Sequence, residues 1–111
     1  MTEKKYLIEI ATADLETTRQ AVQGGADRIE LCANLGEGGT TPAYGTLRRC
    51  RELFEVPIFP IIRSRSGDFL YGDDEYHSMQ YDIEIVKSLG FEGVVIGMLL
   101  ADGQIDLSRT A

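Results

Sequence analysis

Three ionisable side chains occur where predicted β-strands end, and together they could carry out acid–base chemistry. Glu9, Glu30 and Arg63 each lie near the C-terminal end of a short apolar stretch. A buried carboxylate is costly unless it is paired, and one arginine within reach of two glutamates would supply that partner. The trio predicts general acid–base catalysis or ligand binding, with Arg63 orienting an anionic or hydroxylated substrate. A layer of ion pairs that only stabilises the fold is the alternative.

The stretch 28–32 also predicts which way its side chains point. Because strand side chains alternate between two faces, the apolar Ile29 and Leu31 share one face and are expected to pack against helices. Glu30 and Cys32 then share the opposite face, toward the site. The second cysteine, Cys50, lies on the apolar stripe of a predicted helix and is interpreted as a small buried hydrophobe. The two cysteines do not resemble the disulfide framework of a small secreted protein.

The loop that follows the third predicted strand is rich in arginine, hydroxyl groups and glycine. Arg65, Gly67 and Asp68 come directly after Arg63. Guanidinium groups bind carboxylates and phosphates through paired hydrogen bonds, so this loop is predicted to bind an anionic ligand or cofactor. An equally weighted alternative is a solvated loop in which Asp68 pairs with Arg65.

Four strand–helix units are predicted to position these residues. Apolar runs predict strands over residues 6–10, 28–32, 57–63 and 93–98, with amphipathic helices between them that end near glycines. The predicted helix N-caps are Thr12, Thr41 and Asp73. The predicted apolar stripes comprise Leu47, Cys50 and Phe54 in the second helix and Tyr76, Met79, Ile83 and Val86 in the third.

Strands joined by helical crossovers predict an α/β fold with a parallel sheet, either doubly wound or closed into a TIM (β/α)8 barrel. The first strand is followed by Ala11-Thr12-Ala13 rather than a glycine-rich turn, and several strands end in ionisable residues, which favours the barrel. A whole barrel takes about 250 residues, whereas this chain has 111. Residues 1–111 are therefore predicted to form the N-terminal half of a barrel, about four βα units. We expect a longer protein, or two copies that complete one another.

The composition restricts the classes of partner. The net charge of −7 is spread along the chain, so general nucleic-acid binding is disfavoured. No apolar run approaches the roughly 20 residues that a membrane-spanning helix needs. The charged start, Met1-Thr2-Glu3-Lys4-Lys5, differs from a signal peptide. These features predict a cytoplasmic protein, in which local basic residues could still bind a small anion.

Two longer motifs resemble a known family. The segment Glu30-Leu31-Cys32-Ala33-Asn34-Leu35, followed by Glu37-Gly38-Gly39-Thr40-Thr41-Pro42, resembles the strand-two signature of the CutC family of copper homeostasis proteins. Ile62-Arg63 with Gly67-Asp68-Phe69-Leu70-Tyr71, and Gly97 with Asp102-Gly103-Gln104-Ile105-Asp106, are similar to its later motifs. Where relatives usually show Arg-Pro-Arg-Gly-Gly-Asp, this chain has Arg63-Ser64-Arg65-Ser66-Gly67-Asp68, a substitution expected to loosen the loop.

The resemblance implies a cytoplasmic (β/α)8 barrel, often a homodimer, with a role in copper handling. It makes Cys32 the candidate ligand for Cu(I), since soft thiolates select that ion, and it does not extend to Cys50. The alternative function is a TIM-barrel enzyme that acts on a small polar, sugar-like or phosphorylated substrate. In that enzyme Glu9 and Glu30 would be the acid and base, or metal ligands, and Arg63 the anion anchor.

Overall fold

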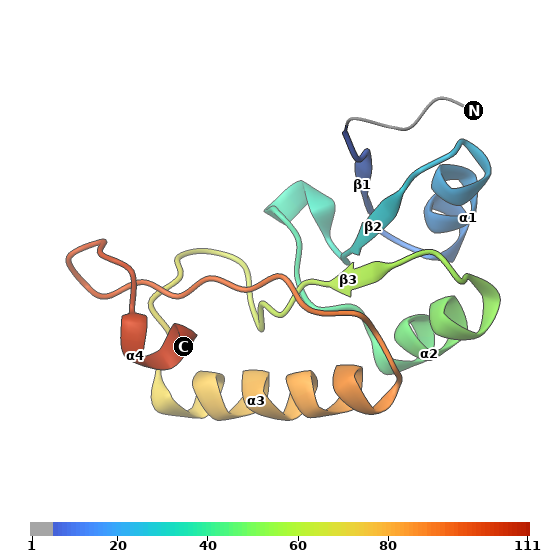
Figure 1. Cartoon of the computed structure of the whole chain (residues 1–111). Coiled ribbons are helices and arrows are strands. Elements are labelled where there is room, and N and C mark those ends of the chain that lie inside the picture. Colours follow the sequence, from blue (N-terminus) through green and yellow to red (C-terminus); the bar gives the residue numbers. More distant parts are fainter. Residues whose placement is uncertain (1–5) are drawn as a thin grey trace.

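The computed structural model describes residues 6–111. The chain alternates strands and helices, as predicted for an α/β protein (Figure 1). Its elements are β1 (Glu9–Thr12), α1 (Leu15–Gln23), β2 (Arg28–Leu31), the 3-10 helix η1 (Leu35–Glu37), α2 (Tyr44–Leu53), β3 (Ile58–Pro60), α3 (Asp73–Ser88) and α4 (Leu107–Thr110).

The three strands form one parallel sheet in the order β1-β2-β3. Glu9 lies opposite Arg28 in the first strand pair, and Glu30 lies opposite Phe59 in the second. Each parallel connection passes through a helix, and Figure 1 shows α1, α2 and α3 along one side of the strip of strands. The other face of the sheet, which would line the inside of a barrel, is not covered by these helices.

The core lies between the strands and their helices. Ile29 and Leu31 are fully buried, as the alternation of β2 predicted. The predicted stripe of α2 is confirmed, because Leu47, Cys50 and Phe54 are buried. Burial of these apolar side chains is the main stabilising contribution to the fold.

Helix α1 begins two residues later than predicted. Asp14, and not Thr12, is the N-cap: its carboxylate accepts a hydrogen bond from the amide of Thr17 at 2.7 Å. Thr12 is instead buried at the end of β1, where its hydroxyl forms a 2.7 Å hydrogen bond with that of Thr18. A carboxylate is favoured at a helix N-terminus by the helix dipole, so Asp14 is the better cap.

Helix α2 likewise begins after its predicted cap. Its N-cap is Ala43 rather than Thr41. The Thr41 hydroxyl accepts a hydrogen bond from the amide of Arg63 at 2.9 Å, and is therefore used to hold the loop against the end of the third strand.

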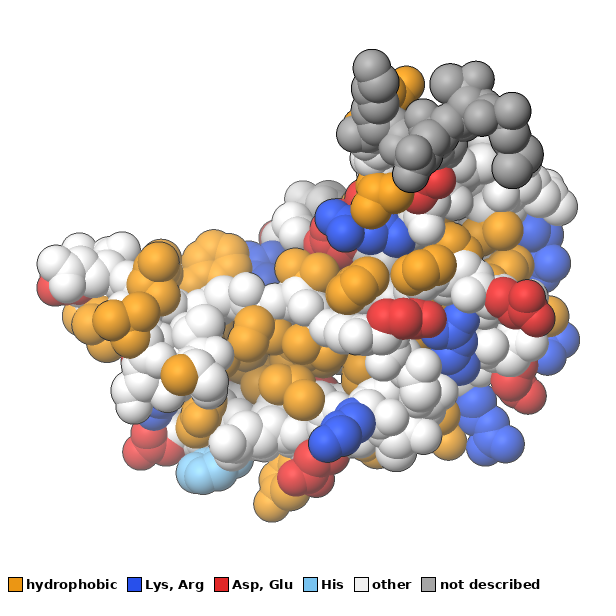
Figure 2. Space-filling view, viewed as in Figure 1, with side chains coloured by type: hydrophobic (Ala, Val, Ile, Leu, Met, Phe, Trp, Pro, Cys, Tyr) orange, Lys and Arg blue, Asp and Glu red, His pale blue; other side chains and the backbone are white. Residues whose placement is uncertain are grey.

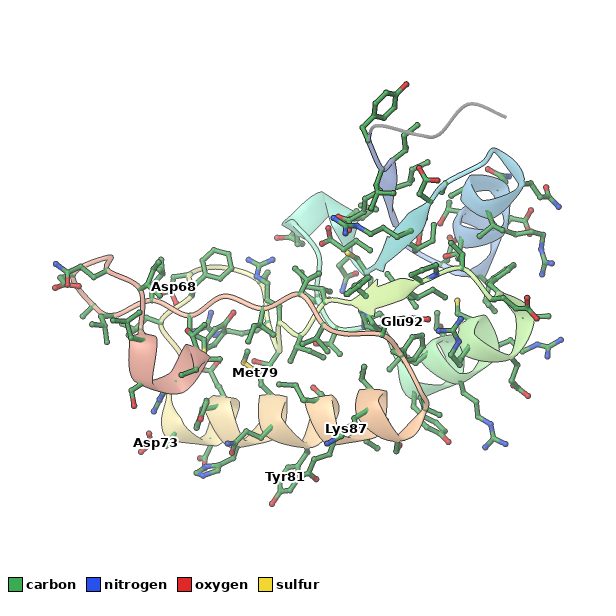
Figure 3. The ribbon with its side chains drawn as sticks, in the orientation of Figure 1. Asp68, Asp73, Met79, Tyr81, Lys87 and Glu92 are labelled. Atoms are coloured by element: carbon green, nitrogen blue, oxygen red, sulfur yellow. The ribbon has the colours of Figure 1, made fainter. Side chains whose placement is uncertain are left out.

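Helix α3 buries the predicted face. Asp73 is its first residue rather than its cap, and Gly72 takes the N-cap position. Met79 and Val86 are buried. Figure 3 shows Met79 pointing from α3 toward the rest of the domain and Tyr81 pointing away from it.

The first and fourth strands differ most from the prediction. The first begins at Glu9 instead of residue 6. Residues 93–98 form no strand; Val95 makes an isolated parallel bridge with Ile61. Gly93 and Gly97 weaken strand formation there because they offer no side chains to pack. Gly93 also lies so close to Phe59 that an added Cβ would sit 2.8 Å from its ring.

Candidate functional site

The guanidinium of Arg63 is the centre of the candidate site. Arg63 follows β3 and is only 7% exposed. Its Nη1 donates hydrogen bonds to the carbonyl oxygens of Glu37 at 2.7 Å and Gly39 at 2.8 Å, and its Nη2 donates to the carbonyl of Gly67 at 2.8 Å. The ring of Phe69 lies against the cation, with its centroid 5.0 Å away. Arg63 thus joins the loop after β2 to the loop after β3.

The glycine pair after η1 allows this close approach. Gly38 and Gly39 have φ angles of 88° and 97°, in the left-handed region that glycine adopts without strain. A Cβ at Gly38 would lie 3.2 Å from Nη1 of Arg63, and one at Gly39 would lie 3.4 Å from Sγ of Cys32. The glycine-rich motif is therefore explained by the backbone path that brings carbonyls to Arg63.

Cys32 lies beside Glu30 on the inner side of β2, as predicted. Its side chain is buried, and the Sγ–H donates to Oε1 of Glu30 at 3.5 Å. Burial, followed by the negative charge of Glu30, raises the pKa of the Cys32 thiol to about 12. The sulfur is therefore protonated at neutral pH.

Glu9 has a different place from the one predicted. It begins β1, because the strand starts three residues later than expected, and it forms an ion pair with Nε of Arg28 at 2.6 Å. Glu9 is thus at the N-terminal end of its strand, whereas Arg63 lies beyond the C-terminal end of β3.

The predicted trio is not brought into mutual contact. Glu9 pairs with Arg28, Glu30 contacts Cys32, and Arg63 binds backbone carbonyls. Within residues 6–111 no hydrogen bond or ion pair joins Glu9 to Glu30, and the catalytic roles of these residues stay predictions.

The loop residues that were predicted to bind an anion mainly bind one another. Arg65 forms ion pairs with Glu75 and, at 3.1 Å, with Asp68. Its Nη2 also donates to the carbonyl of Leu70 at 2.8 Å. Gly67 contributes its carbonyl to Arg63. Arg65 therefore fastens the loop to the start of α3, which matches the alternative interpretation of a loop with an internal Arg65–Asp68 pair.

Sequence reasoning assigned no chemistry to Tyr71, which the structure places in the site. A cavity of about 140 Å³ is lined by Arg63, Phe69 and Tyr71 together with the apolar residues Ile61, Ile62, Val95 and Ile96 and with Gly97. The Tyr71 hydroxyl and the Nε of Arg63 are both buried without a hydrogen-bond partner. The sequence shows only that a tyrosine follows the loop that contains Arg63 and Arg65. Its burial could not be predicted because it depends on tertiary contacts.

The described residues offer few ligands for a copper ion. Within residues 6–111, no cluster of three or more His, Cys, Asp or Glu side chains could hold a metal. Cys32 provides one soft sulfur, with the hard carboxylate of Glu30 next to it. Cys50 is a buried free thiol on α2. These residues supply one favourable ligand for Cu(I) and do not form a complete site by themselves.

Comparisons with known proteins agree on one family. The family model described as CutC family matches residues 6–111. A CutC family protein of Chromobacterium violaceum is 49% identical over 104 residues, covering 94% of this chain and 42% of the relative. One of Salmonella newport is 52% identical over 103 residues, with coverages of 93% and 42%. This chain thus spans about two fifths of the length of these relatives.

A solved structure shows the same fold. The CutC protein of Streptococcus agalactiae, which is named for copper homeostasis, superposes with a TM-score of 0.88 at 28% identity. The match covers 95% of this chain and 52% of that one. The fold is therefore that of a partial TIM (β/α)8 barrel, which confirms the predicted fold class.

Proposed function

This chain belongs to the CutC family, and on that basis we propose that it takes part in copper homeostasis by binding copper as Cu(I). The observation that carries the proposal is the position of Cys32. Its sulfur lies on the inner side of the sheet, buried next to a carboxylate. A buried thiolate is the kind of ligand that selects Cu(I) over harder ions.

Copper binding at Cys32 requires the thiol to lose its proton. A pKa of about 12 makes this loss unfavourable at neutral pH, so Cu(I) must displace the proton. The carboxylate of Glu30, which already accepts the S–H hydrogen bond, is placed to receive it. Copper bound at the sulfur would also remove the repulsion between a thiolate and Glu30.

One sulfur does not hold Cu(I) alone, and we infer that a second copy of the chain supplies a further ligand. Support comes from apolar side chains at both ends of the domain. Tyr6 and Leu7, before β1, are 71% and 65% exposed, and Ile105 and Leu107, near the C-terminus, are 61% and 76% exposed. Figure 2 shows hydrophobic side chains on the projecting C-terminal segment that leads into α4. Association of two copies would cover such surfaces.

The proposed location is the cytoplasm, as expected from the sequence. Both cysteines are free thiols, which supports a reducing compartment. No helix formed by residues 6–111 has both the length and the apolar character to cross a membrane.

Anaerobic titration of the 111-residue chain with Cu(I) against a competing chelator tests the proposal. We expect stoichiometric binding that is lost in Cys32→Ser and retained in Cys50→Ser, because only Cys32 lies on the inner side of the sheet. Unchanged stoichiometry in Cys32→Ser would reject the assigned ligand.

A further inference from the structure

We propose that the cavity between Arg63 and Tyr71 binds a short-chain monocarboxylate, with its carboxylate on these two side chains and its apolar tail against the surrounding aliphatic residues. This site is separate from the proposed copper ligand, because Cys32 does not line the cavity.

The first argument is charge. Arg63 is almost completely buried, yet none of the ion pairs formed among residues 6–111 includes it. Three of its hydrogen bonds go to neutral backbone carbonyls. A buried cation without a counter-charge is costly, and an anion in the adjacent cavity would remove that cost.

The second argument is hydrogen bonding. The Nε–H of Arg63 and the O–H of Tyr71 are buried and form no hydrogen bond of ordinary geometry, although the two side chains lie close enough for Arg63 to act on the Tyr71 pKa. Buried polar groups are almost always paired. Both residues line the same cavity. Burial raises the pKa of the Tyr71 hydroxyl against the opposing effect of the neighbouring Arg63 and Arg65, so it remains a donor at neutral pH. Two unused donors match the two oxygens of one carboxylate.

The third argument is size and lining. A volume of about 140 Å³ accommodates only a few non-hydrogen atoms. Apart from the two donors, the walls are aliphatic side chains and the ring of Phe69. Phosphate would bring four oxygens to two donors and leave the others unsatisfied against apolar walls. Butyrate instead pairs two oxygens with two donors and places a short chain against Ile61 and Val95.

The test uses the metal-free 111-residue chain and sodium butyrate as the probe. Binding is measured by calorimetry and by amide chemical-shift changes in NMR spectra, with phosphate and chloride at equal ionic strength as comparisons. We expect saturable butyrate binding with shifts concentrated at Phe69, Tyr71 and Val95. Cys32→Ser should bind butyrate like the unmodified chain, which separates this site from the copper proposal.

Tyr71→Phe is the decisive variant. It removes a hydroxyl that forms no hydrogen bond of ordinary geometry in the fold, so the chain should fold normally while butyrate affinity falls about tenfold, the loss expected for one hydrogen bond to a charged group. The matched control is Tyr81→Phe on the outer side of α3, where Tyr81 is 67% exposed and affinity should not change. Arg63→Lys, which keeps the charge but removes the Nε–H, should also weaken binding.

Three results would overturn the proposal. They are no butyrate binding, an equal affinity for phosphate at the same residues, and an unchanged butyrate affinity in Tyr71→Phe.

Discussion

Arg63 and Thr41 hold each other through two hydrogen bonds. The amide of Arg63 donates to the Thr41 hydroxyl at 2.9 Å, and its carbonyl accepts from the Thr41 amide at 3.0 Å. This pair fixes the backbone of Arg63 beside the loop whose carbonyls its side chain contacts. The position of the guanidinium is therefore set from both ends of the residue.

Replacement of Thr41 by valine should loosen this attachment. Valine has a similar shape but leaves the Arg63 amide without its acceptor, so we expect a loss of about 1–3 kcal/mol in the free energy of unfolding. Urea denaturation followed by circular dichroism measures the change. Thr41→Ser keeps the hydroxyl and should lose less than half as much; equal losses in the two variants would contradict the role of the hydrogen bond.

Gly39→Ala should destabilise the chain, while Gly45→Ala should not. Gly39 is buried with a φ of 97°, a conformation that costs an alanine about 1–2 kcal/mol. Gly45 lies exposed in α2 with open space around it, so alanine there should add about 0.5–1 kcal/mol. Thermal unfolding of both variants checks the opposite signs. A stabilised Gly39→Ala chain would show that the left-handed conformation is not needed.

The raised pKa of Cys32 makes the fold sensitive to alkaline pH. Because the folded pKa of about 12 exceeds the ordinary value of 9.0, burial of the neutral thiol contributes fully below pH 9 and its contribution is lost as the pH rises toward 12. We expect Cys32 in a Cys50→Ser background to resist alkylation at neutral pH.

The alkylation rate of the same Cys50→Ser chain, followed as a function of pH, gives the Cys32 pKa without interference from the five tyrosines. Glu30→Gln should lower it by removing a neighbouring negative charge, but burial, the larger cause, should keep it above the ordinary value. A Cys32 pKa near or below 9 would contradict the buried position of the sulfur.

The chain should associate into dimers through its exposed apolar surfaces. Light scattering over a dilution series should show a dimer that dissociates on dilution. Leu7→Glu places a charge on the surface before β1 and should weaken association at least tenfold. Tyr81→Glu, on the outer side of α3, serves as the control (Figure 3). A monomer at every concentration tested would count against the proposed assembly.

Much of the fold could be predicted because local patterns determine it. The alternation in 28–32 correctly placed Ile29 and Leu31 in the core and Cys32 beside Glu30. The periodic apolar stripes identified the buried faces of α2 and α3, and glycines follow the ends of α1 and α3. These features depend on the spacing of residues within one element.

The predictions that were wrong concern features set by contacts between segments far apart in the sequence. Thr12 and Thr41 both carry hydroxyls that could cap a helix. The Thr12 hydroxyl is instead hydrogen-bonded to that of Thr18, and the Thr41 hydroxyl accepts from the Arg63 amide. The N-caps are therefore Asp14 and Ala43. Arg63 was expected to pair with glutamates and instead donates to backbone carbonyls. Since every residue has a backbone carbonyl, the residue types in the sequence do not indicate this partner. The stretch 93–98, predicted to be a strand, pairs with the segment around β3 through Val95 alone, whose amide donates to Pro60 and whose carbonyl accepts from Ile62.

The use of backbone carbonyls by Arg63 has a consequence for variation within the family. Because the guanidinium contacts the backbone carbonyls of Glu37 and Gly39, substitutions of the side chains around the glycine pair leave the contact intact, whereas Gly38 and Gly39 are needed for the close approach. An insertion or deletion would instead move the carbonyls out of register. Relatives that keep the arginine should therefore vary in the other residues of the loop while conserving its length and its two glycines.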